Sequence, residues 1–159
     1  MTPDILTIEP ITLVGLSVQT TVVGHEDTRN LWQSFGPQRR GVPNKLGPEA
    51  YSVSIFPSPG IPMPQSPVEK WATVPVSSTD AIPEGLKPLT LPAGLYAHFV
   101  YRGPVSTFGA TLQQFYGQWL PTSGYTLDHR PFFEILGEKY LGPMNPDSEE
   151  DIYIPVRKA

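Results

Sequence analysis

The chain has 159 residues and a formal net charge of −4, only 16% of its residues are charged, and it contains no cysteine. Its basic residues are scattered, with Arg39 and Arg40 the one adjacent pair of arginines. This distribution argues against a phosphate-gripping surface and hence against direct nucleic-acid binding. The absence of cysteine excludes disulfides, thiolate nucleophiles and cysteine-based metal sites.

The N-terminus and the hydropathy pattern give no sign of a membrane or export address. Asp4 stands where a signal peptide needs positive charge, and no apolar run reaches the roughly 18 residues of a membrane span. The length is typical of one domain, and the aromatic content of 11% is too high for a disordered chain. We therefore expect a single cytoplasmic domain over residues 1–159.

The first half of the chain predicts one helix among three strands. Thr7–Thr21 is β-branched and alternating, which indicates a strand with a bend at Gly15. Asp27–Arg39 has capping residues at its start and an apolar stripe, and its Gly-Pro step favours a distortion or an end of the helix. Ala50–Phe56 and Trp71–Val76 follow as strands.

The second half repeats this order after a stretch rich in proline. Pro57–Pro92 is expected to be mostly loop. Leu95–Tyr101 is a strand candidate, and Val105–Leu120 predicts a helix with aromatic residues along one face. Phe132–Leu136 and Ile152–Val156 complete the set, and the proline in the last of these favours an edge strand.

The order of elements therefore predicts an α+β fold made of two β-α-β-β units. The first repeat spans about residues 5–77 and the second about 92–157. Their strands are expected to form one curved antiparallel sheet with both main helices on one face. The opposite face would then be concave, uncovered and lined by aromatic side chains, which suits a small-molecule groove between the halves.

Four segments in the last third carry a family resemblance. They are Gly94–Gly103, the Trp119-Leu-Pro-Thr-Ser-Gly-Tyr125 turn, Phe132-Phe-Glu-Ile135 and Asp151–Val156. In this order they resemble the GyrI-like, or AraC-type, effector-binding domain, a small-molecule module of bacterial transcription activators that also occurs alone. The resemblance implies a stand-alone member with a ligand groove between the halves and an acid in an aromatic pocket, at the position of Glu134.

Glu134 is the residue that most needs an explanation. Alternation places Phe132, Glu134 and Leu136 on one face of their strand. A buried carboxylate is costly unless a partner compensates it. One interpretation puts Glu134 on the concave face, where it attracts a cationic or hydrogen-bond-donating ligand. The other is a rim carboxylate paired with Arg130 or another base.

The ligand wall is predicted from aromatic residues in the strand patterns. Side chains with an apolar body and a polar tip suit a pocket, although ordinary packing against the helices is the alternative. The wall candidates, with Phe132 beside Glu134, are Tyr51, Trp71, Tyr96, His98 and Tyr153. Phe108, Phe115 and Trp119 recur at helical spacing and are expected in the core.

Other site chemistries find little support in the sequence. His25, His98 and His129 match no common ligand spacing, so no metal site is expected, and no phosphate loop or dinucleotide fingerprint implies a cofactor. His98 could pair with Glu134 to move a proton, or be an ordinary strand-edge histidine. The acidic run Asp147–Asp151 is expected to be a solvated loop, or a contact for a basic partner.

The preferred function is binding of a lipophilic small molecule, cationic or polar-aromatic, for sensing or sequestration. Glu134 would supply charge complementarity. One alternative is a small-molecule hydrolase in which Glu134 is the general base, as the resemblance allows. Another is a protein inhibitor of the DNA gyrase type, which requires a protein partner.

Overall fold

The computed structural model describes all 159 residues and is an α+β fold built on one nine-stranded antiparallel sheet. The strands are β1 (Asp4–Ile8), β2 (Ile11–Thr21), β3 (Ala50–Ile55), β4 (Pro67–Pro75), β5 (Lys87–Leu91), β6 (Gly94–Arg102), β7 (Tyr125–Leu127), β8 (Phe132–Leu136) and β9 (Glu149–Lys158). The helices are α1 (His25–Phe35) and α2 (Phe108–Gln114), with short helical turns η1 (Arg39–Gly41), η2 (Val105–Thr107), η3 (Phe115–Trp119) and η4 (Leu120–Thr122). The predicted fold class is confirmed.

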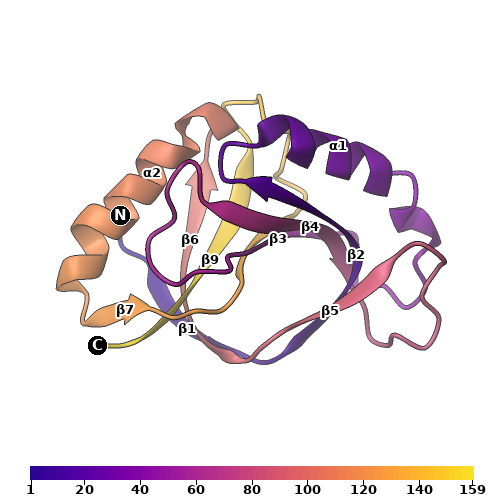
Figure 1. Cartoon of the computed structure of the whole chain (residues 1–159), viewed down its shortest axis with the longest axis horizontal. Coiled ribbons are helices and arrows are strands. Elements are labelled where there is room, and N and C mark those ends of the chain that lie inside the picture. The colour runs from indigo at the N-terminus through magenta and orange to yellow at the C-terminus, as the bar shows by residue number, and fades with distance from the viewer.

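The sheet consists of two halves that meet at its centre. The strand order is β1-β6-β9-β8-β3-β4-β2-β5, and β7 pairs with the end of β9. Each half has the same arrangement of strands, and β3 and β8 join the halves. Both helices lie on one side of this sheet, at the top of Figure 1, while the edge strands β1 and β5 lie at the bottom.

Two separate apolar clusters hold the helices on this helix face. Under α1, Leu31 and Phe35 pack against Val14 and Ala72 of β2 and β4. Under α2, the fully buried Phe115 packs in a cluster with residues of β6, β8 and β9. Burial of one such large side chain contributes roughly 1.5–3 kcal/mol. Strand β3 lies between the two clusters, paired with β8 on one side and β4 on the other.

The opposite face is not left uncovered, contrary to the expectation. A third cluster fills it with side chains from both halves and both edges of the sheet, namely Leu13, Val53, Trp71, Leu91, Tyr96 and Phe133. Ile8 of β1 and Leu89 of β5 pack against the same cluster. The sheet curls until its edges seal this face, so its aromatic residues form a core.

The proline-rich middle of the chain contains more strand than its composition predicted. Strand β4 begins at Pro67, and β5 (Lys87–Leu91) pairs with β2. Pro88 is tolerated because β5 is an edge strand and needs hydrogen bonds on only one side. The expected long first strand is divided between β1 and β2, which belong to different halves of the sheet.

Pro155 does not lie in an edge strand, so that prediction was wrong. Strand β9 lies between β6 and β8, and Pro155 pairs with Tyr96 of β6. The β8–β9 ladder ends at Tyr153, and β7 pairs with β9 only from Val156 onward. Pro155, which has no backbone N–H group, therefore lies between the last residue of β9 that pairs with β8 and the first that pairs with β7.

Both predicted helices exist, with different ends. Helix α1 begins at His25 after Gly24, two residues before the expected cap, and ends at Phe35 next to the Gly-Pro step. The second predicted helix is α2 followed by the π-helical turn η3, in which the N–H of Leu120 bonds to the carbonyl of Phe115. No helix of the chain is both long and apolar enough to span a membrane.

Gly15 is required by a close approach between β2 and β4. A Cβ atom at this position would lie 1.9 Å from the carbonyl oxygen of Ala72. We expect Gly15→Ala to lower the free energy of unfolding by about 1–3 kcal/mol, because the two backbones must separate. Urea denaturation measures this loss. Gly109→Ala is the control, since its Cβ meets nothing within 4 Å and alanine favours the helix; equal stability of both variants would contradict the prediction.

Candidate functional site

Glu134 lies on the helix face, at the centre of the sheet. It pairs with Ser52 of β3 on one side and with Ile152 of β9 on the other. Ser52 and the next residue on this face, Ser54, are buried and small. We call the helix-face surface formed by Ser52, Ser54 and Glu134 the central seam, since it lies between the clusters under α1 and α2.

A second carboxyl group, that of Glu150, adjoins the central seam. Glu150 is two residues before Ile152 on β9, and therefore on the same face as Glu134. The side chains of Glu134 and Glu150 share a hydrogen bond. Burial, followed by the charge of Glu134, raises the pKa of Glu150 to about 9, and burial also raises the pKa of Glu134. One proton shared by the pair satisfies this hydrogen bond at neutral pH.

Lys70 supplies the positive charge of this cluster. It pairs with Ser54 in the β3–β4 ladder, and its Nζ donates a hydrogen bond of 2.9 Å to Ser54 Oγ. Its charge lowers the pKa of both Glu134 and Glu150, in opposition to burial. Tyr140, from the loop between β8 and β9, is also close, because burial and then the charges of the two glutamates raise its pKa to about 12.

The arrangement suits a cationic or hydrogen-bond-donating group. Two carboxyl groups face one ammonium group, and all three side chains are partly buried, where charge interactions are stronger than in water. Phe132, on the same strand face as Glu134, adds an aromatic side chain from the α2 cluster. Glu150 was missed by the sequence analysis, which assigned it to a solvated loop. Extending the alternation of Ile154 and Ile152 back by one step would have placed it on this face.

The five predicted wall residues lie on the face of the sheet opposite to Glu134, so they do not line one groove with it. Tyr51, Tyr96 and Tyr153 all contact Phe133, which points away from the central seam. The rings of Tyr51 and Tyr153 stack on Phe133 at centroid distances of 5.8 and 4.6 Å. Of the seven predicted ligand residues, the structure brings together only Glu134 and Phe132 on the helix face.

Trp71 and His98 have partners of their own on the opposite face. The indole N–H of Trp71 donates to Glu69, and the ammonium group of Lys87 lies 4.9 Å from the Trp71 ring centroid. The Nε2 atom of His98 lies 2.7 Å from a carboxylate oxygen of Asp151. The interpretation of His98 as a proton partner of Glu134 is therefore wrong.

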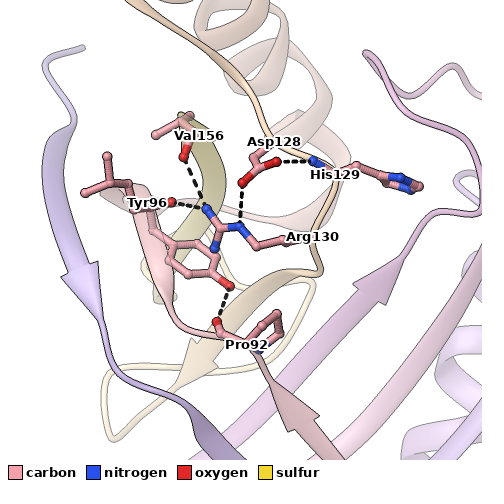
Figure 2. A network of polar contacts seen from close by, with 7 residues as sticks. Pro92, Tyr96, Asp128, His129, Arg130 and Val156 are labelled. Atoms are coloured by element: carbon pink, nitrogen blue, oxygen red, sulfur yellow. Dashed lines mark hydrogen bonds and ion pairs between the residues drawn. The ribbon is translucent and has the colours of Figure 1, made fainter. Parts of the chain in front are cut away.

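Arg130 does not pair with Glu134 either. Its Nε donates to Asp128 at 2.8 Å, and one terminal nitrogen donates to the carbonyl oxygens of Leu95 and Val156, as Figure 2 shows. Its guanidinium group lies 4.6 Å from the ring centroid of Tyr96. This hydrogen bonding and charge hold the pKa of Asp128 below its usual range. The network joins β6, β9 and the segment before β8, which is a structural role.

The start of the proline-rich segment covers one end of the helix face. A small pocket of about 30 Å³ is lined by Tyr116, Phe132 and Ile154 together with four residues of this segment, namely Ser58, Pro59, Gly60 and Pro62. This volume is about that of one water molecule. The segment therefore lies close to Phe132, the neighbour of Glu134 on the helix face of β8.

The protonation of Glu150 predicts a pH dependence of stability. Its pKa rises from an ordinary value of 4.5 to about 9 in the folded protein, so the folded state holds a proton that the unfolded state loses. This contribution to stability is complete below pH 4.5 and is lost as the pH rises toward 9. We expect Glu150→Gln to flatten the fall in melting temperature between pH 5 and pH 9, measured by circular dichroism. An unchanged slope, equal to that of the exposed control Glu138→Gln, would contradict this.

Comparisons with known proteins agree with the fold and with the resemblance. The family described as "Cass2: Integron-associated effector binding protein" matches residues 4–156. The transcriptional regulator BrlR of Pseudomonas aeruginosa is 27% identical over 127 residues, covering 79% of this chain and 45% of BrlR. A DNA gyrase inhibitor of Erwinia billingiae is 36% identical over 78 residues, 48% of each chain. The chain thus matches about half the length of these curated relatives.

Solved structures show the same fold at low sequence identity. The structure of SAV2435 bound to tetraphenylphosphonium superposes with a TM-score of 0.72 at 16% identity, covering 99% of this chain and 94% of that one. The integron cassette protein VCH_CASS2 from the mobile metagenome of Vibrio cholerae gives a TM-score of 0.66 at 16% identity, covering 98% and 96%. These structures show the fold, and the match over residues 4–156 shows that the chain belongs to the integron-associated effector-binding (Cass2) family of GyrI-like proteins.

Proposed function

We propose that this protein binds lipophilic organic cations at the central seam, in sensing or in sequestration. The observation that carries the proposal is the pair of partly buried carboxyl groups, Glu134 and Glu150, opposed by the single ammonium group of Lys70. An ion pair with a purely structural role needs only one carboxylate to balance the Lys70 ammonium group. The second carboxyl group can balance the positive charge of a bound organic cation.

The neighbouring side chains support a lipophilic rather than a small inorganic cation. Phe132 and Tyr140 flank the carboxyl pair, and aromatic rings attract organic cations by roughly 0.5–2 kcal/mol per good contact. The structural neighbour SAV2435 was solved with tetraphenylphosphonium, which is a bulky aromatic cation. The same class of ligand fits the charge and the apolar rim described for this chain.

Two ions of the same shape and opposite charge test this proposal. We expect isothermal titration calorimetry to detect binding of tetraphenylphosphonium, and binding of tetraphenylborate to be at least tenfold weaker, since one charge contact is worth about 1.4 kcal/mol or more. Equal affinity for the two ions would remove charge recognition from the site. Absence of binding by both would reject the proposed ligand class.

A hydrolase remains the second candidate because of the same two carboxyl groups. Two hydrogen-bonded carboxyl groups that share one proton are a combination that can act as acid and base on a bound electrophile. Turnover separates the two functions. Consumption of strained-ring or ester electrophiles by the wild type, but not by Glu134→Gln, would establish the enzyme; stable binding without consumption would reject it.

A further inference from the structure

The proton held between Glu134 and Glu150 couples ligand binding to proton release, an inference that rests on the proposed function. The strand register places the two carboxyl groups on the same face of the adjacent strands β8 and β9. Lys70 reaches this face from β4, on the other side of β3 and its Ser54. We propose that Glu150 is a second ligand-binding carboxyl group that releases its proton to solvent when a lipophilic cation enters the central seam.

The charge balance of the cluster favours this exchange. Without ligand, the carboxyl pair with its one shared proton carries one negative charge, which balances the positive charge of the Lys70 ammonium group. A permanent cation adds one positive charge, and loss of the Glu150 proton as H⁺ removes one. The partly buried site then remains neutral, whereas retention of the proton would leave it with an uncompensated charge, which is costly away from water.

The two tyrosines near the carboxyl pair do not supply the proton or the negative charge. Tyr140 has its pKa raised to about 12 and stays neutral. The hydroxyl of Tyr101, the residue paired with Glu150 on β6, is hydrogen-bonded to Pro104 and Thr107. Lys70 is the one alternative proton source, and it donates to Ser54.

Calorimetry of tetraphenylphosphonium binding in buffers of different ionisation enthalpy, phosphate and Tris, counts the released protons. We expect nearly one proton per bound ion for the wild type at pH 7, where Glu150 is still protonated. Its affinity should rise by up to tenfold per pH unit between pH 6 and pH 8. Glu150→Gln keeps the hydrogen bond to Glu134 but has no proton to lose, so it should bind with no proton release and with little dependence on pH.

Lys70→Met tests the charge balance of the cluster, and Glu150→Gln tests the source of the proton. Without the lysine, the carboxyl pair with its one proton carries a single negative charge that the bound cation neutralises, so we expect Lys70→Met to bind with little proton release. Proton release that persists in Glu150→Gln would assign the proton to Lys70 or to another group and overturn the inference. Binding by the wild type without proton release would overturn it as well, while leaving the proposed function intact. Failure of all three proteins to bind would reject the proposed function, and the inference with it.

Discussion

The double variant Glu134→Gln/Glu150→Gln is expected to lose at least a hundredfold in affinity for tetraphenylphosphonium, which corresponds to about 2.8 kcal/mol or more. Both carboxyl groups are then neutral, and the Lys70 ammonium group remains in the central seam without a counter-charge. An unpaired positive charge in a partly buried site repels a second cation. Isothermal titration calorimetry measures the loss.

Each single variant, Glu134→Gln or Glu150→Gln, is expected to lose less than half of the binding free energy that the double variant loses. In Glu134→Gln the remaining Glu150 no longer faces a carboxylate, which is one cause of its raised pKa, so it ionises more easily and takes over part of the attraction. A loss of about threefold for each single variant is therefore expected, so the double variant should lose more than the product of the two single losses, which is coupling between the two positions.

A matched control separates this local effect from net charge. Glu138→Gln removes the same charge from an exposed position just after β8, outside the central seam. It should bind like the wild type. If the double variant also retains wild-type affinity while remaining folded by circular dichroism, the carboxyl pair has no part in ligand binding.

The strand containing Glu134 could be predicted to the residue, but the face on which Glu134 lies could not. Alternation correctly separated Phe132 and Glu134 from Phe133, because side chains alternate strictly along a strand. Both faces of this strand carry aromatic side chains, so local hydrophobicity does not say which one meets the helices. Ser52 and Ser54 were the usable signal, since two small polar residues on one face of β3 mark the helix-face seam.

The sealing of the opposite face depends on long-range geometry. Leu91 of β5 and Ile8 of β1 are far from Phe133 in sequence, and they reach its cluster only because the whole sheet curls. No single strand pattern contains that curvature. Aromatic residues that would line a groove in a flatter sheet therefore pack as core, which is why Tyr96 and Trp71 are buried.

The acidic run Asp147–Asp151 shows a second reason why part of the candidate site could not be predicted from the sequence. Its charges predicted a solvated loop, yet Glu149–Asp151 is the start of β9. Successive side chains of this strand lie on opposite faces of the sheet. Glu150 lies on the helix face beside the central seam, and Asp151 lies on the other face, where it contacts His98. Tertiary partners that are distant in sequence compensate these charges, and local composition carries no information about them.

The second large effect is expected for Arg130→Met, which should lower the free energy of unfolding by about 3 kcal/mol. The Arg130 side chain is only 13% exposed, and its removal leaves the carbonyl groups of Leu95 and Val156 without this donor. Asp128, at 35% exposure, loses its cation but can be solvated, so the cost falls mainly on the two carbonyl groups and on packing against Tyr96.

Arg102→Met is the control for Arg130→Met, because it breaks an ion pair of similar length on the surface. The Arg102–Asp147 pair spans 2.9 Å with both side chains more than 60% exposed, and such pairs contribute roughly 0–1 kcal/mol.

For a chain of this size, the loss of 3 kcal/mol expected for Arg130→Met corresponds to a melting temperature about 6–12 °C lower. Arg130→Lys should recover only part of the loss, since one ammonium group cannot reproduce the planar guanidinium fork. Equal melting temperatures for Arg130→Met and Arg102→Met would show that the buried network does not stabilise the junction of β6 and β9.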